Sequence, residues 1–281
     1  MPVQQINVDG IDVFIEGEGA QTVLMIHGWP DTYRLWDGQV AHLKDGYRCV
    51  RFTLPGFDIA KPSRPMSITQ MMVLFKAIVE AVAPGQKVTL MLHDWGCLLG
   101  YEFYARHPEL VQRVVGVDIG DFNSGELARS RNFKAKFGVF YYQMWLAIAW
   151  MIGGALGTRM TRSMARALRC RSDPAFIGAQ MNYLYHMAWF GSHGGMRGMA
   201  RAQPFKPMLF IYGERKPFMF HSPRWLEKLA ATPLCEAKGF ATGHWVMMQQ
   251  PQAFNQCVSD WLARTELPLP SSASLPTPTG A

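Results

Sequence analysis

The chain alternates between short runs of apolar residues and longer segments in which apolar residues recur every three or four positions. The apolar runs have the length of strands that are buried on both faces of a parallel sheet. They lie at residues 22–26, 47–54, 88–92, 111–119 and 208–212. Segments with helical spacing separate them, and this alternation predicts an α/β fold with a mostly parallel central sheet covered by helices on both faces.

Turn and cap residues mark the ends of several predicted elements. Residues 3–16 alternate around Asp9-Gly10, which predicts a β-hairpin. Ser67 and Gln70 have the spacing of a capping box, so we expect a helix to begin behind Ser67. That helix should end before Pro84-Gly85.

The alternation of strand and helix stops in the second half of the chain. Residues 123–205 have helical patterns without a clear buried strand, and the α/β pattern resumes at 206–264. We therefore predict one α/β core, formed by 1–122 and 206–264, with a helical insert at 123–205. Residues 265–281 are rich in Pro, Ser and Thr, which predicts a disordered tail.

The charge of the chain narrows its possible partners. The net charge is +7 over 281 residues, but no nucleic-acid recognition motif accompanies it, so we expect no nucleic-acid partner. The Lys and Arg residues concentrate at 129–171, which assigns them to the surface of the insert. A weak attraction to anionic membrane surfaces is the alternative, but we do not expect stable membrane association.

The cysteines and the apolar runs bear on the compartment. The five cysteines are widely spaced and form no CxxC motif, which argues against both a disulfide framework and a zinc site. Residues 1–10 are polar and mixed, unlike a signal peptide, so we expect a cytoplasmic protein. Residues 137–154 are the one membrane-like run, and their length and polar members favour a pocket-lining helix.

The most informative stretch is 88–100. A buried strand ends at His93-Asp94-Trp95-Gly96, and a helical pattern follows directly. Strand, tight turn and helix are the context of a nucleophile elbow, in which one side chain is held where a substrate can reach it. A carboxylate at Asp94 could attack an electrophilic carbon and form an ester. The alternative is that Asp94 merely caps the helix.

This elbow resembles that of the α/β-hydrolase superfamily, in the epoxide hydrolase and haloalkane dehalogenase branch, where it commonly reads His-Asp-Trp-Gly. The resemblance covers nearly the whole chain up to Arg264 and implies that the insert is a cap domain over the elbow. It also implies Asp94 as the nucleophile, with no organic cofactor and no metal. Leu92 departs from the pattern, because the family usually has a small residue there.

Two further loops match the same family. His27-Gly28-Trp29-Pro30 follows a strand, where the family has a His-Gly-x-Pro loop. The resemblance implies that the backbone amides of Trp29 and Trp95 form an oxyanion hole, whereas a plain Gly-Pro turn is the alternative. His244, in a late Gly-His-x motif, is implied as the base that activates water. We expect His27 and His93 to hold loop structure.

The acid that orients His244 is harder to identify. Lys216 occupies the position where epoxide hydrolases usually carry it, and a lysine cannot orient an imidazolium. Part of the dehalogenase group carries the acid after the preceding strand, and alignment with that group places Asp121 there. We expect Asp121 to contact His244. The competitors are Glu214 and Asp118, which we expect to lie within the strand. A helix cap is the alternative role for Asp121.

Two tyrosines of the insert complete the candidate site. The segments around Tyr142 and Tyr185 look like those that carry the ring-opening tyrosines of epoxide hydrolases. A phenol can donate a hydrogen bond or a proton to the departing oxygen. The alternative is ordinary amphipathic packing of these rings.

Taken together, these residues and the family that they resemble imply a hydrolase that converts a small apolar epoxide to a vicinal diol through an ester on Asp94. A haloalkane dehalogenase with the same ester chemistry is the alternative enzyme. In that case Trp95 would donate to the halide, but Trp29 stands where a second donor is usual. The third interpretation is a non-catalytic binding protein of the same fold. We expect a monomer or homodimer.

Overall fold

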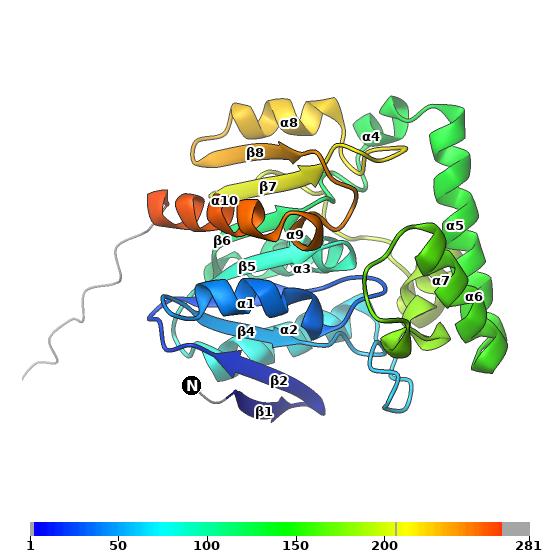
Figure 1. The fold of residues 1–281 in the computed structure, drawn as a ribbon, viewed down its shortest axis with the longest axis horizontal. Coiled ribbons are helices and arrows are strands. Elements are labelled where there is room, and N and C mark those ends of the chain that lie inside the picture. The colour runs from blue at the N-terminus through cyan, green and yellow to red at the C-terminus, as the bar shows by residue number, and fades with distance from the viewer. Residues whose placement is uncertain (1–2, 206, 266–281) are drawn as a thin grey trace, which may run out of the picture.

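The computed structural model describes residues 3–205 and 207–265, and it is built around one eight-stranded sheet (Figure 1). The strands are β1 (Gln4–Val8), β2 (Ile11–Glu16), β3 (Thr22–Ile26), β4 (Arg48–Phe52), β5 (Val88–His93), β6 (Val111–Val117), β7 (Met208–Gly213) and β8 (Cys235–Phe240). They are ordered β1-β2-β4-β3-β5-β6-β7-β8. The β1–β2 and β2–β4 pairs are antiparallel, and all others are parallel, as the apolar runs predict.

Helices cover both faces of this sheet, and each face has its own apolar core. The core helices are α1 (Asp37–Leu43), α2 (Ile68–Val82), α3 (Trp95–Arg106), α8 (Pro223–Ala230), α9 (Val246–Gln249) and α10 (Pro251–Arg264). Residues of α2, α3 and α8 pack in one buried cluster, which continues into the cap. Residues of α1, α9 and α10 pack in a second cluster on the other face. The central parallel strands are therefore buried on both sides, which is why they read as unbroken apolar runs.

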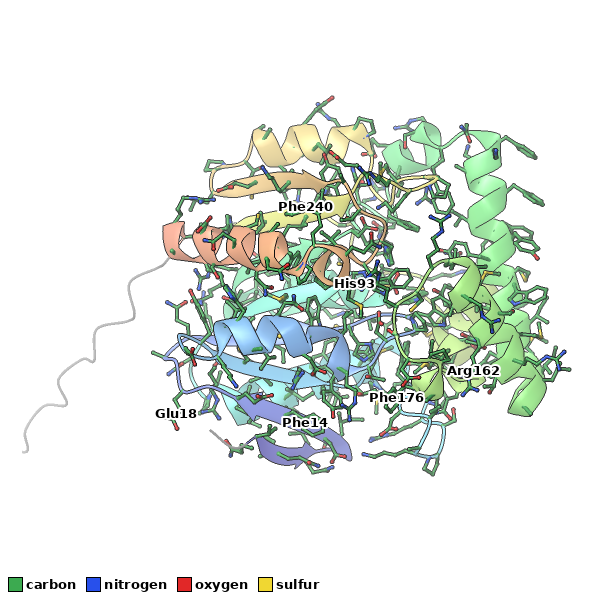
Figure 2. The ribbon with its side chains drawn as sticks, in the orientation of Figure 1. Phe14, Glu18, His93, Arg162, Phe176 and Phe240 are labelled. Carbon is green, nitrogen blue, oxygen red and sulfur yellow. The ribbon has the colours of Figure 1, made fainter. Side chains whose placement is uncertain are left out.

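Between β6 and β7 the chain leaves the sheet and forms helices. They are α4 (Gly125–Ser130), α5 (Phe133–Ile152), α6 (Gly154–Ala167) and α7 (Tyr183–Phe190), with short 3-10 turns between them. Figure 1 shows this insert beside one end of the sheet, with α5 on its outer side. In Figure 2, His93 at the end of β5 lies on the side of the sheet near the insert, and Arg162 lies within the insert.

Several local predictions can be compared directly with the structure. Ser67 and Gln70 form a capping box at the start of α2, with both reciprocal hydrogen bonds present. The 3–16 segment is the β1–β2 hairpin. The five cysteines are free thiols. Among the described residues, no helix, α5 included, is long and apolar enough to cross a membrane. The predicted tail lies almost wholly outside the described residues.

Leu92, the departure from the family pattern, is accommodated by a glycine on the next helix. Leu92 is fully buried on β5. A Cβ atom built at Gly100 of α3 would lie 2.4 Å from Leu92 Cδ2, far inside van der Waals contact. The leucine side chain therefore occupies the space that a side chain at position 100 would need, and the strand and helix of the elbow still pack closely.

This packing predicts a coupled pair of substitutions. Gly100→Ala alone should destabilise the protein by about 1–3 kcal/mol, because the new methyl group overpacks a core that cannot expand freely. Adding Leu92→Ala should relieve that overlap, so the double mutant should be more stable than the sum of the two single effects predicts. Urea unfolding of the four proteins measures the coupling. Strict additivity would show that the two positions do not compete for space.

Candidate active site

Asp94 stands between β5 and α3 in a strained backbone conformation. Its φ is 52° and its ψ is −122°, a region that residues with a side chain rarely adopt. Its side chain makes no capping hydrogen bond to α3, so the helix-cap interpretation is not supported. The turn instead directs the carboxylate toward the insert. A strained residue in a strand–turn–helix context is the geometry of a nucleophile elbow.

Two backbone amides face the Asp94 carboxylate. The Trp29 N–H donates to Asp94 Oδ1 at 2.7 Å, and the nearby Trp95 N–H helps to lower the pKa of this carboxylate. The approach is close because residue 28 has no side chain: a Cβ atom at Gly28 would lie 2.5 Å from Asp94 Cβ. The backbone amides of Trp29 and Trp95, which the sequence predicts as a pair, thus both lie beside the Asp94 carboxylate.

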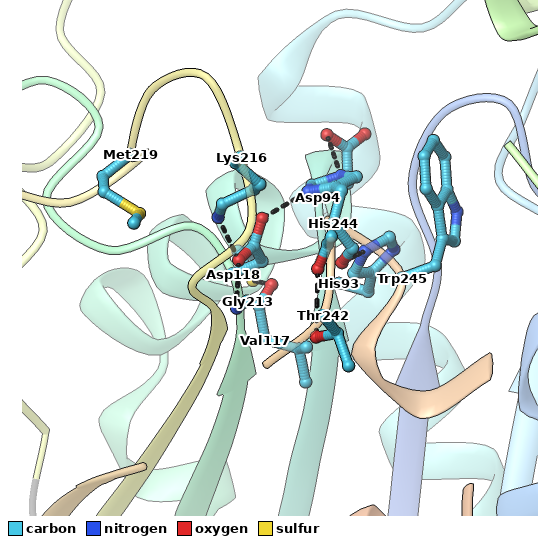
Figure 3. Close-up of polar contacts among 12 residues, drawn as sticks. His93, Asp94, Val117, Asp118, Gly213, Lys216, Met219, Thr242, His244 and Trp245 are labelled. Carbon is cyan, nitrogen blue, oxygen red and sulfur yellow. Dashed lines mark hydrogen bonds and ion pairs between the residues drawn. The ribbon is translucent and has the colours of Figure 1, made fainter. Parts of the chain in front are cut away.

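His244, in the loop after β8, lies against the same carboxylate. Its Nε2 is 3.3 Å from Asp94 Oδ2, and its Nδ1–H donates to Asp118 Oδ2 at 2.5 Å (Figure 3). Burial by itself lowers the pKa of His244, but the Asp118 and Asp94 carboxylates outweigh burial and raise it to about 9. The His244 ring is therefore a positively charged imidazolium while both carboxylates are ionised.

The prediction that Asp121 orients His244 is wrong: Asp118 makes that contact. β6 ends at Val117, one residue before Asp118, so Asp118 is the first residue beyond the strand rather than part of it. Its φ of 71° turns the chain at this point. The carboxylate is fully buried and also accepts a hydrogen bond from the Gly213 N–H at 2.9 Å, at the end of β7.

Asp121 has a structural role instead. Its carboxylate accepts hydrogen bonds from the Ser222 N–H at 2.8 Å and the Ser222 hydroxyl at 2.6 Å. The Ser124 hydroxyl donates to it as well, at 2.6 Å. Ser222 and Ser124 are the N-caps of α8 and α4, so Asp121 joins the starts of two helices. Glu214, the other competitor, is exposed and has no hydrogen bond to His244.

Lys216 is the site residue whose role the sequence did not indicate. Its ammonium group donates to Asp118 Oδ1, while His244 uses Oδ2 of the same carboxylate (Figure 3). The Lys216 side chain is only 5% exposed. Burial raises the pKa of Asp118, but Lys216 and His244 outweigh this and hold it below its usual value. Lys216 stands where epoxide hydrolases usually carry the acid. In this chain it stabilises the negative charge of Asp118 instead.

The two other histidines near the site are structural, as expected. His27 donates through Nδ1–H to the Gly28 carbonyl at 2.9 Å, and its Nε2 accepts from the Leu54 N–H at 2.9 Å. His93 Nε2–H donates to the His244 carbonyl at 3.2 Å. Burial lowers the pKa of His27 to about 4 and that of His93 to about 3, so both rings are neutral.

A cavity of about 640 Å³ lies between the elbow and the insert. Asp94, His244, Tyr142 and Tyr185 all line it, so the two predicted tyrosines share one cavity with the Asp94 carboxylate. Their rings pack edge to face, 6.1 Å apart, and the Tyr185 ring also packs on those of Trp29 and Trp95. Burial, with the nearby Asp94 charge, raises the pKa of both phenols, so both hydroxyls keep their protons.

The indole N–H of Trp29 forms a hydrogen bond with the insert. This N–H donates to Asn182 Oδ1 at 2.7 Å, and Asn182 in turn donates to the Thr161 hydroxyl at 2.7 Å. Asn182 and Thr161 are both fully buried in the insert. This polar chain, which the sequence did not reveal, connects the loop after β3 to the cap.

Comparison with known proteins agrees with this geometry. The family model described as alpha/beta hydrolase fold matches residues 21–165, about half of the chain. The Mycobacterium tuberculosis protein named probable oxidoreductase EphD is 34% identical over 38% of this chain and 19% of its own length. Epoxide hydrolase 1 of Caenorhabditis elegans is 26% identical over 43% of this chain and 31% of its own length. The chain thus spans roughly a fifth to a third of these relatives.

Solved structures extend the similarity to nearly the whole chain. An epoxide hydrolase from Bacillus megaterium superposes with a TM-score of 0.65 at 20% identity, covering 92% of this chain and all of the other. At that identity the likeness concerns the fold. The resemblance drawn from the elbow, the oxyanion loop and the late histidine is confirmed at the level of the family. The chain belongs to the α/β-hydrolase fold family and is similar to the epoxide hydrolases within it.

Proposed function

We propose that this protein is a hydrolase that opens epoxides to vicinal diols through a covalent ester on Asp94. The observation that carries the proposal is the line Asp94–His244–Asp118, which meets two tyrosine hydroxyls across one cavity. The names of several similar proteins point to the same reaction. The proposed substrate is a small apolar epoxide, since aromatic rings form much of the cavity wall near Asp94.

In the first step an Asp94 oxygen attacks one epoxide carbon, and the bond from that carbon to the ring oxygen breaks. The departing oxygen gains negative charge and takes a hydrogen bond, then a proton, from Tyr142 or Tyr185. Both phenols are protonated before the reaction, because burial disfavours their ionised forms. The product of this step is an ester of Asp94 that carries a neighbouring hydroxyl group.

In the second step His244 takes a proton from a water molecule, which attacks the ester carbonyl. The negative charge on Asp94 is one of the factors that raise the pKa of His244. Ester formation removes that charge, so the imidazole becomes more easily neutral when a base is needed. The Trp29 and Trp95 amides hold the oxyanion. The ester then releases the diol, and the proton taken from water returns to the tyrosine, which completes the addition of one water.

The halide chemistry of a dehalogenase has less support. A dehalogenase needs a second hydrogen-bond donor to the halide besides Trp95. The Trp29 indole stands at the sequence position where that donor is usual. Its N–H is already donated to Asn182 Oδ1 at 2.7 Å, inside a buried hydrogen-bond chain. We therefore favour epoxide opening.

The decisive experiment traps the ester. His244→Gln removes the base but leaves Asp94, so incubation with a panel of aryl and alkyl epoxides should add the mass of one substrate to the protein. Intact-mass spectrometry and peptide mapping should place the adduct on Asp94, and Asp94→Ala/His244→Gln should show none. An unmodified His244→Gln protein across the panel would favour a non-catalytic protein, and chloride release from haloalkanes would favour the dehalogenase.

The same assay separates the two aspartates that follow β6. Asp118→Asn should also accumulate the ester, with turnover falling by about 10³–10⁴-fold, because the imidazole loses its orienting carboxylate. Asp121→Asn should lower stability but should not accumulate ester in the protein that remains folded. Ester build-up in Asp121→Asn at unchanged melting temperature would contradict this assignment.

The charge of Lys216 should set the pH dependence of ester hydrolysis. Lys216→Met removes a positive charge from Asp118, so the carboxylate stabilises the imidazolium more strongly and the pKa of His244 rises. Less neutral base is then present near pH 7, so hydrolysis of the ester should slow there by roughly tenfold. The rising limb of the pH profile should move to higher pH. Lys216→Arg keeps the charge and should keep the wild-type profile; a Lys216→Met profile that coincides with wild type would remove this role.

The tyrosine hydroxyls should act in ester formation. Tyr142→Phe and Tyr185→Phe keep the rings and remove the donors, so each should raise the barrier by about 2–4 kcal/mol. Single-turnover measurement of ester formation isolates this step. Tyr141→Phe is the matched control, since Tyr141 is 53% exposed on the same helix and should leave the rate unchanged. Full epoxide turnover in both test variants would argue against epoxide opening by these residues.

A further inference from the structure

The outer side of α5 carries a continuous stripe of exposed apolar side chains. They are Phe133, Phe137, Phe140, Tyr141, Ile148, Met151 and Ile152. With about 100° of rotation per residue, all seven lie within about 120° of the helix circumference. Phe133 is 84% exposed, Phe137 58% and Met151 60%. These side chains therefore project into solvent and do not belong to the edge of the core.

The stripe continues onto the neighbouring cap helices. Leu156 of α6 is 57% exposed, and Trp189 and Phe190 of α7 are 43% and 54% exposed. The Phe140 and Trp189 rings pack 5.3 Å apart, which joins the α5 and α7 parts. We call these ten residues the outer cap face. Of the fifteen large hydrophobic residues exposed in the described chain, only Val3, Val73 and Leu234 lie in the α/β core.

The charge of the cap differs sharply from that of the rest of the chain. Residues 123–205 contain eleven Lys and Arg residues and two acidic residues, Glu126 and Asp173, which gives them a net charge of +9. The remaining residues carry −2, and the sum is the +7 of the whole chain. Lys134 and Lys136, both exposed, flank the stripe at its first turn. Exposed aromatic side chains within a surface almost free of acidic residues are the combination that binds an anionic lipid interface.

We propose that the outer cap face docks on the surface of an anionic phospholipid bilayer. The apolar stripe would enter the boundary between headgroups and acyl chains, with α5 lying in the plane of the membrane, and the Lys and Arg residues would meet lipid phosphates. A second copy of the chain fits this face less well, because a symmetric pair would bring together two cap domains that each carry a net charge of +9 and only two acidic residues. This proposal revises the expectation that stable membrane association is absent.

The opposite side of α5 belongs to the cavity. Tyr142 lies about 140° around the helix from the middle of the stripe, and it lines the cavity with Asp94 and His244. Figure 1 shows α5 on the side of the cap away from the sheet. One helix thus presents its outer side to lipid and its inner side to the candidate site, so a docked protein would hold its cavity close to an apolar reservoir. The docking proposal rests on the surface alone and does not require epoxide chemistry.

Vesicle flotation tests the proposal with the full chain. The protein should float with vesicles of equal parts phosphatidylcholine and phosphatidylglycerol but not with phosphatidylcholine alone, and molar salt should weaken binding at least about tenfold. Phe133→Ser/Phe137→Ser/Met151→Ser should lower the partition coefficient at least about 100-fold, because three inserted side chains are lost. These residues are exposed, so the melting temperature should be kept.

Matched variants on the core separate docking from general stickiness. Val73→Ser removes a side chain that is 62% exposed on α2, and Leu234→Ser one that is 57% exposed; both should bind like wild type. Lys134→Glu/Lys136→Glu should weaken binding, whereas Lys87→Glu, on the core, should not. Hydrogen exchange in residues 133–152 should slow on vesicles. Absent flotation, equal loss in the core variants, or a wild-type dimer that the triple variant converts to monomer without any vesicle binding would overturn the proposal.

Discussion

The Asp118 carboxylate is the charge on which the electrostatics of the site depend. It is fully buried, and an isolated carboxylate in that position would protonate rather than remain charged. It stays ionised because three donors surround it: the Gly213 N–H, the Lys216 ammonium and the His244 Nδ1–H. The ionised carboxylate in turn accepts the Nδ1–H of His244, which orients the ring so that Nε2 faces Asp94. Removing any one of these three donors should therefore change how strongly the Asp118 carboxylate interacts with the other two.

This arrangement exists because parallel strands end at one edge of the sheet. Trp29 follows β3, Asp94 follows β5 and Asp118 follows β6, while Lys216 and His244 lie in the loops after β7 and β8. Asp94 and His244, which are 150 positions apart in the chain, therefore lie 3.3 Å from each other. Loops at the carboxyl ends of parallel strands are the usual place for ligand sites in such sheets. The rigid sheet holds the backbone amides of Trp29 and Trp95 in position, and the cap supplies the aromatic wall of the cavity.

The cap combines two surfaces of different character on a small set of helices. Its inner side is tied to the core by the Trp29–Asn182–Thr161 chain, whose members are all buried. Its outer side leaves aromatic and aliphatic residues in solvent at a density that the core surface does not approach. A soluble protein rarely exposes such a contiguous patch without a partner. The overall charge of +7 conceals this contrast, because the acidic core offsets the basic cap.

The sequence by itself determined the class of fold, the place of the elbow and most residues of the candidate site. These features are local: apolar period, turn residues and short motifs report the conformation of adjacent residues. The choice between Asp118 and Asp121 is not local. Both follow the same strand, three residues apart, and only the end of β6 at Val117 and the positive φ of Asp118 decide which carboxylate faces His244. The role of Lys216 and the exposure of the α5 stripe likewise depend on what packs beside them, because burial and charge pairing are properties of the folded chain, which no single segment carries.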